Sequence, residues 1–251
     1  MTLRRITFAL FLFCGLAAAA ITFGVASVTN INAGAQGISG NGDLVVTLPI
    51  GWAAGQVALL LLYLDSGDGS TPSGWTEVTD SPFGSGTEHM CVFYRRLEVG
   101  DGNPTTTVSG NSGCAAGAMM TFAGVDTAVP IEAVSADSQG TGTPMIAYSV
   151  NTVTAGAWAI GCCGRGDNEV AGSQAFGGST TGVTERLDAG TNAGADAELS
   201  AYSKEIASVG ATTGEGTAVT NATDPWVSVI VVLRPLPEPA ATYGDFWLMF
   251  D

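Results

Sequence analysis

The hydrophobic pattern is clearest in residues 56–65, which read QVALLLLYLD. This apolar run follows a glycine and precedes a cluster of aspartates and glycines. It is too short to span a membrane as a helix, which needs about 20 residues. A short apolar run between turn signals predicts a strand that is buried on both faces. A buried helix is the alternative, because leucine favours helices and periodicity alone does not decide between the two.

Other stretches of alternating or apolar residues predict further strands. In residues 89–96, HMCVFYRR, the alternation places one set of side chains on each face of a sheet. The remaining predicted strands are residues 21–28, 43–48, 74–77, 105–109, 114–123, 130–134 and 225–233. Residues 30–42 and 65–72 are rich in Gly, Asn, Asp and Ser, and they predict loops.

The second half of the chain repeats features of the first half. GVTE at residues 182–185 echoes GWTE at 74–77, and Tyr202 echoes Tyr94 at the same spacing. One copy of such a repeated unit cannot bury its apolar face by itself, so we expect the two copies to share one core.

The predicted fold is therefore all-β. It is an antiparallel β-sandwich, jelly-roll-like, with an internal pseudo-two-fold duplication. The sandwich spans residues 21–234 and is built from two related halves, about residues 43–134 and 145–234. Two separate small domains are the alternative.

Composition agrees with this fold class and limits the partners. Hydrophobic residues make up 46% of the 251 residues and charged residues only 12%, while 35 glycines supply turns. The formal charge is −15, from 23 acidic and 8 basic residues. Such a surface repels phosphate backbones, which argues against a nucleic-acid partner. Solubility alone explains the acidity, and a salty medium would also suit it.

The first 20 residues, MTLRRITFALFLFCGLAAAA, have the form of a secretory signal peptide. A positive start precedes an apolar stretch, and small residues follow it. Two alternatives stay open. The segment is retained as an anchor or interface helix, or the domain begins near Ile21 after an upstream start codon.

The last residues, 235–251, combine a proline-rich spacer with an aromatic end, YGDFWLMFD. Prolines impose an extended segment that cannot join a central strand. An apolar tip after a stiff spacer should dock on its own domain or on a neighbouring subunit, as an added strand or anchor. The predicted assembly contacts are Tyr243, Phe246, Trp247, Leu248, Met249 and Phe250.

No catalytic signature is found in the sequence. The only histidine, His89, stands at the start of a predicted strand, and no Ser-His-Asp or Cys-His set can be assembled around it. We predict no catalytic residue, no cofactor and no metal site, so the chain is not expected to be an enzyme. Cys91 and Cys114 could form a disulfide, whereas Cys162 and Cys163 are adjacent and point to opposite faces of a sheet. The simplest interpretation is that the cysteines are small buried residues.

Three weaker motifs were also weighed. Asp65 and Asp68 could offer oxygens to Ca²⁺, but their spacing does not match an EF-hand, and a plain turn explains them. The tripeptide Arg165-Gly166-Asp167 is known from integrin ligands and arises easily by chance in a Gly-rich loop. Acidic residues in or beside loops could form a glycosidase-type pair, although nothing selects one. They are Asp65, Asp68, Glu77, Asp167, Glu169 and Glu185.

The run from residue 21 to 134 resembles a recurrent domain of tailed-phage virion proteins. The similar motifs are GDLVV, PSGWTEV, VFYRR and GVD followed by PIEAV, and the apolar strand up to Pro235 completes the likeness. These motifs are structural rather than catalytic. The resemblance implies a β-sandwich of the tail-fibre, head-fibre or decoration type.

The first functional hypothesis is therefore a non-enzymatic virion structural protein at the virion surface. It would act as a homo-oligomer and dock on other virion or surface-layer proteins. The alternative is a secreted or cell-surface filament subunit, or a β-sandwich that binds a host-surface glycan. A groove lined by Trp52, Trp75 or Trp158 would favour glycan binding, but we expect Trp75, Trp158 and Trp226 to be largely core.

Overall fold

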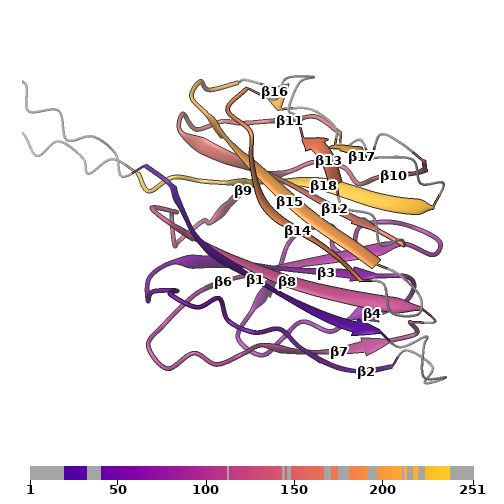
Figure 1. Cartoon of the computed structure of the whole chain (residues 1–251). Coiled ribbons are helices and arrows are strands. Elements are labelled where there is room, and N and C mark those ends of the chain that lie inside the picture. The colour runs from indigo at the N-terminus through magenta and orange to yellow at the C-terminus, as the bar shows by residue number, and fades with distance from the viewer. Residues whose placement is uncertain are drawn as a thin grey trace, which may run out of the picture.

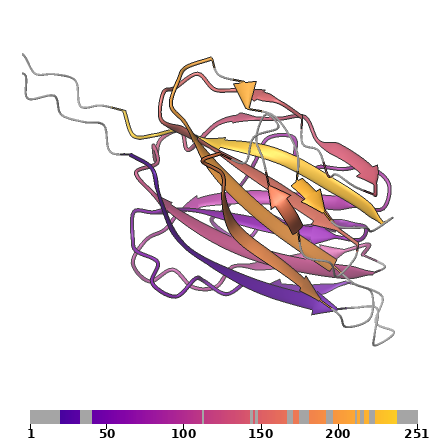
Figure 2. The same cartoon turned by 45° about the horizontal axis from the view of Figure 1, so that its top comes forward.

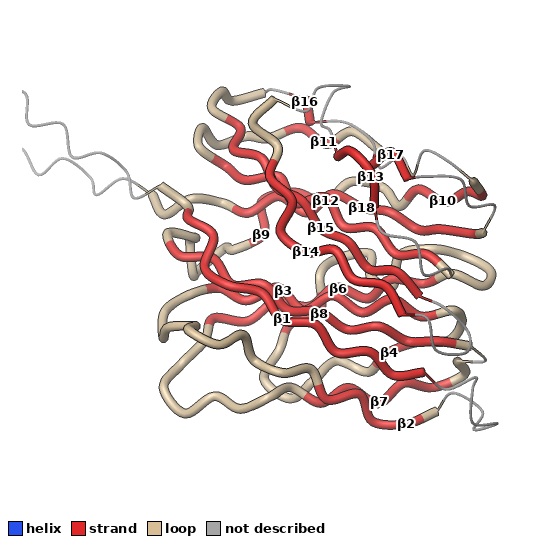
Figure 3. Tube along the Cα trace, in the orientation of Figure 1, coloured by secondary structure: helices blue, strands red, loops and turns tan. Residues whose placement is uncertain are grey.

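The computed structural model describes most of the chain between residues 20 and 237. The described residues are 20–32, 41–111, 113–142, 145, 148–166, 171–174, 181–191, 197–210, 212–213, 217–219 and 224–237. Their regular structure consists of β-strands, without a helix (Figure 3). All the strand pairs are antiparallel, which confirms the all-β antiparallel class. Within these residues no helix is long and apolar enough to cross a membrane.

The first main sheet is centred on the apolar run that dominates the sequence. Its strand order is β1 (Thr22–Asn32), β8 (Cys114–Ala123), β3 (Val57–Leu64), β6 (His89–Arg96) and β5 (Thr76–Glu77). Every side chain of β3 is buried, so the strand interpretation of this run is confirmed. β1 runs past the predicted residue 28 to Asn32, into part of the predicted loop.

The second main sheet has a matching strand order. It runs β10 (Ser138–Thr141), β18 (Pro225–Leu233), β12 (Ala157–Arg165), β15 (Ala197–Ile206) and β14 (Thr184–Thr191), and β9 (Ile131–Val134) also pairs with β18. The internal duplication nevertheless stays a prediction. Tyr94 packs toward the core between the main sheets, whereas Tyr202 is buried on the outer face of the second sheet. The two echoed tyrosines are therefore not equivalent.

Small sheets cover the outer faces of both main sheets, so the molecule has four layers (Figures 1 and 2). The first main sheet is covered by β2 (Gly42–Val45), β7 (Thr105–Ser109) and β4 (Asp68–Gly69). On the second lie β11 (Val150–Asn151) paired with β16 (Thr212–Thr213), and β13 (Ala171–Gln174) paired with β17 (Thr217–Val219). β4 falls inside a predicted loop, and β2 ends at Val45 rather than at residue 48.

Three apolar clusters fill the spaces between these layers. Leu59 and Leu61 of β3 face Ile160 of β12 in the cluster that both halves of the chain share. The alternate residues Leu60 and Leu62 pack outward against the small sheet that contains β2. Because β3 is covered on both faces, its sequence is apolar throughout instead of alternating. Each fully buried leucine contributes about 1.5–3 kcal/mol to folding.

Candidate functional site

The predicted assembly contacts, Tyr243, Phe246, Trp247, Leu248, Met249 and Phe250, lie outside the described residues. The structure does describe the chain that leads to them, up to Pro237. The candidate site is therefore built from the root of this tail and from the grooves near it.

The tail root is paired by its backbone to the segment that follows β8. The amide of Asp126 donates to the carbonyl of Arg234 at 2.9 Å, and the amide of Arg234 donates to the carbonyl of Pro130 at 3.0 Å. Two residues further on, the amide of Leu236 donates to the carbonyl of Gly124 at 2.9 Å. The chain is thus fixed for three residues beyond the end of β18.

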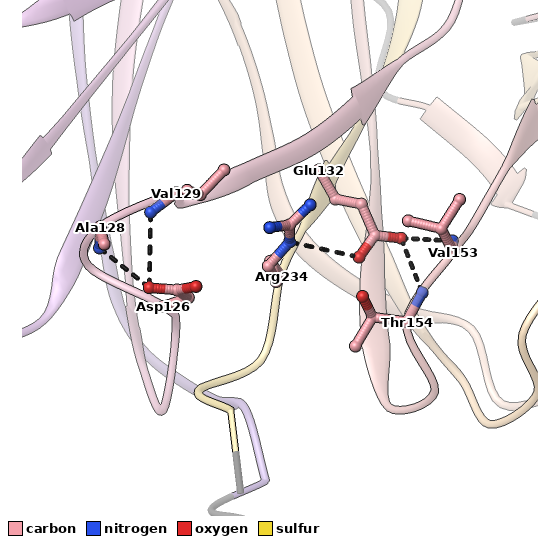
Figure 4. A network of polar contacts seen from close by, with 7 residues as sticks. All are labelled: Asp126, Ala128, Val129, Glu132, Val153, Thr154 and Arg234. Atoms are coloured by element: carbon pink, nitrogen blue, oxygen red, sulfur yellow. Dashed lines mark hydrogen bonds and ion pairs between the residues drawn. The ribbon is translucent and has the colours of Figure 1, made fainter.

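A buried carboxylate reinforces this root (Figure 4). The side chain of Glu132, on β9, is 0% exposed and lies 3.7 Å from Nε of Arg234. One of its oxygens accepts hydrogen bonds from the amides of Val153 and Thr154, at 2.6 and 3.1 Å. A buried charge that is paired and hydrogen-bonded is costly to disturb. Glu132 therefore ties the tail root to the turn before β12.

A second carboxylate shapes the neighbouring turn, also seen in Figure 4. Oδ1 of Asp126 accepts hydrogen bonds from the amides of Ala128 and Val129, at 2.9 and 3.4 Å. This is a local turn contact of the kind that aspartate favours. It fixes the segment to which the tail root is paired.

Both ends of the described chain meet at Gly124. This glycine has a φ of +76°, and a Cβ added there would collide with the carbonyl oxygen of Ala20. Near the C-terminal end of the described chain, the amide of Leu236 donates to the carbonyl of the same glycine. The chain thus enters the fold at Ala20 and leaves it at Pro237 from one corner of the molecule (Figures 1 and 2).

A groove opens along β1, close to this corner. We call it the Arg186 groove; it measures about 540 Å³. Its lining residues are Phe23, Gly24, Val25, Ala26, Ser27, Thr47, Leu48, Ile50 and Arg186. β1 and β14 are the edge strands of the two main sheets, so the groove lies at the seam between them. Ile50 is 95% exposed on its rim.

Arg186 is held between two aromatic rings. Its guanidinium carbon lies 4.5 Å from the ring centre of Phe23 and 5.2 Å from that of Trp158. Its Nε donates to the hydroxyl of Ser203 at 2.7 Å. Partial burial lowers the pKa of Arg186 from its ordinary value. Among the residues whose side chains the structure describes, no carboxylate forms an ion pair with it, and its partners are the two aromatic faces and the Ser203 hydroxyl.

A second groove, of about 430 Å³, lies at the same end of the molecule beside β5 and β6. It is lined in part by Arg95, Arg96 and Glu98. Arg95 already pairs with Asp101 at 2.5 Å. Glu98 in the lining and the Arg95–Asp101 ion pair offset the positive charge of the second groove more than that of the Arg186 groove is offset.

The opposite end of the sandwich contains a buried acid that the sequence did not single out. Glu88 is 4% exposed, and the hydroxyl of Tyr63 donates a hydrogen bond to its carboxyl group. Burial, with a smaller contribution from Asp224, raises the pKa of Glu88 to about 8. Gly166 lies close to both side chains. The pair lies beside Gly166, at the end of β12, far from the tail root.

The other sequence candidates have structural positions. Nδ1 of His89 contacts the carbonyl of Gly67, which anchors the turn after β3. Cys91 packs on the outer face of the first main sheet and Cys114 on its inner face, and no disulfide joins them. Cys162 and Cys163 face opposite sides of β12, as predicted.

The arginine of the Arg-Gly-Asp tripeptide is buried and is not displayed for recognition. Arg165 is 0% exposed and lies directly opposite Glu198, which is equally buried, in the β12–β15 pairing. Asp167 and Glu169 lie outside the described residues. Burial raises the pKa of Asp65, and no group of three metal-binding side chains is found among the described residues.

The tryptophans are mostly core, as expected. Trp75 and Trp226 are 9% and 6% exposed. Trp158 is only partly buried, and it stacks under Arg186. Neither Arg186 nor Glu88 was predicted from the sequence. Glu88 directly precedes a predicted strand, which is a weak signal, while Arg186 follows the echoed GVTE motif and has no local signature.

Comparison with models of known families, with curated proteins and with solved structures finds no match to this chain.

Proposed function

We propose that this chain is a non-enzymatic structural protein that self-associates and docks on a particle, as a virion surface protein of the decoration, head-fibre or tail-fibre type. The observation that carries this proposal is the shared corner at Gly124, where both ends of the described chain meet. Two apolar sequences, within residues 1–19 and 243–251, continue from that corner. A rigid body whose two described ends meet at one corner suits attachment through that corner.

Composition supports attachment through the C-terminal tail. Aromatic residues and methionine are enriched in the cores of protein interfaces, and charged residues are depleted there. Residues 246–250, FWLMF, contain only such apolar types. The proline spacer and the hydrogen-bonded root would present this sequence at a defined place. The tail is therefore the proposed contact with neighbouring copies or other particle proteins.

The chemistry of the described residues also favours a structural role. Glu88, whose pKa is raised to about 8 by burial, is almost fully buried and bonds a core tyrosine. Glu132 and Asp126 accept hydrogen bonds from backbone amides and hold turns. In these contacts the acids support the fold.

The test is removal of residues 243–251 from the full chain, followed by sedimentation equilibrium and circular dichroism. We expect an unchanged β-sheet spectrum and a smaller assembly, because the deletion removes no residue of the described strands. The control replaces Ala240 and Ala241 with serine, which alters the spacer but leaves the aromatic end intact. An assembly of unchanged size after the deletion would sink the proposal. A native monomer lacking residues 1–20 would instead indicate the secreted binding module.

A further inference from the structure

The Arg186 groove presents a cation in an apolar setting. Phe23 and Val25 line it, and the guanidinium of Arg186 lies over the Phe23 ring. The chain carries a net charge of −15, yet no acid whose side chain the structure describes forms an ion pair with Arg186. A groove of this kind suits a ligand that is apolar and aromatic and that also carries a carboxylate.

The position of β1 at the edge of its sheet bears on the shape of the ligand. β1 is an edge strand, and its ladder with β8 shifts between Phe23 and Ala26. The amide of Val25 bonds the hydroxyl of Thr121 there, instead of a backbone carbonyl. As the terminal strand of its sheet, β1 has one side without a strand partner, and extended peptides bind to such edges in other proteins.

The chain itself contains a segment with these properties. Residues 246–251 read FWLMFD, five apolar residues followed by an aspartate, and Asp245 precedes them. Residues 1–19 are also apolar, but they carry Arg4 and Arg5 and would place like charges beside Arg186. Charge complementarity therefore selects the C-terminal segment.

We propose that the Arg186 groove binds residues 246–251 of a second copy of this chain. The groove begins at Phe23, close to the corner where Leu236 leaves the fold. Eight residues, 238–245, separate the described chain from the aromatic end, and at about 3.3 Å per residue they reach at most about 26 Å. The proposed self-association through the tail assigns the groove to the tail of a neighbouring copy. The inference rests on the proposed function, because it names the receptor for the proposed tail.

The experiment uses full-length protein with Arg186→Gln, and sedimentation equilibrium measures its self-association. We expect the association constant to fall about tenfold, because the carboxylate loses its charged partner. Arg186→Lys provides a second variant that keeps the charge, and circular dichroism verifies folding of both. Arg96→Gln is the matched control, since it removes an exposed arginine from the second groove. A synthetic peptide of residues 243–251 should compete with the wild-type assembly.

Photo-crosslinking identifies the copy that supplies the tail. A photoreactive phenylalanine analogue at position 250 of isotope-labelled chains, mixed with unlabelled chains, should crosslink to the β1 segment of the other isotope. Crosslinks confined to one chain would refute a second copy as the occupant. Wild-type association of Arg186→Gln, or weakening by Arg96→Gln instead, would overturn the groove assignment while leaving the tail-based function intact. Loss of that function is detected separately, by the tail deletion.

Discussion

At the scale of single residues, Glu88 links stability to pH. Its pKa is raised by burial to about 8, from an ordinary value of 4.5. Between these values the folded protein keeps a proton that the unfolded chain has released, so stability falls as pH rises through this window. Glu88→Gln should remove this pH-dependent loss of unfolding free energy, which is at most about 5 kcal/mol. Urea unfolding at several values between about pH 5 and pH 8 measures it.

The control for this prediction is Glu98→Gln, which neutralises an exposed glutamate. Its unfolding midpoints should follow those of the wild type at every pH. If Glu88→Gln keeps the full pH dependence of the wild type, Glu88 is not the group responsible. The hydroxyl of Tyr63 fits this account, because a protonated carboxyl group can both accept and donate hydrogen bonds.

At the scale of elements, β12 is shaped by its glycines. A Cβ at Gly164 would collide with the ring of Tyr63, and a Cβ at Gly161 with the ring of Tyr202. Both rings are fully buried, on opposite faces of the sheet. The tyrosines therefore occupy space that the side chains of β12 leave empty. This explains how one strand packs closely against aromatic residues on both faces.

The corresponding prediction is that Gly164→Ala destabilises the protein by about 2–3 kcal/mol, because overpacking a rigid core forces neighbouring groups to move. Urea denaturation at one pH measures the change. Gly102→Ala is the matched control, since a Cβ there meets no atom within 4 Å. Equal stability of the two variants would show that the Tyr63 ring can shift without cost.

The strands that the sequence predicted best are those with their own local signal. β3, β6, β7, β8 and β18 have the predicted boundaries, because apolar runs or alternation end at clear turn residues. β4 was missed because its two residues, Asp68 and Gly69, form a strand only through pairing with β7. Arg186 was missed for a related reason. Its environment comes from Phe23 and Trp158, which are distant in sequence.

At the scale of the whole molecule, the two ends of the sandwich carry different structural features. β1 begins at the Gly124 corner, where Thr22 pairs with Ala123, and it runs toward Cys114 at the other end. The grooves and the tail root lie toward the corner end. The Glu88–Tyr63 pair lies at the far end, where Leu64 pairs with His89. Four-layer packing joins both ends rigidly, so an assembly made at the corner end leaves the far end outward.

This polarity predicts which surfaces an assembly protects. Val99, 92% exposed, follows β6 at the corner end, whereas the exposed Thr87 precedes β6 at the far end. Val99→Cys should react more slowly with a maleimide in the assembled state than in the tail-deleted protein, because neighbouring copies cover it. Thr87→Cys should react equally fast in both states. The described native cysteines are buried and should stay unreactive, and Cys14→Ser removes the remaining thiol. Protection of Thr87→Cys instead would place the contacts at the far end. That result would contradict the proposed link between the Gly124 corner and assembly.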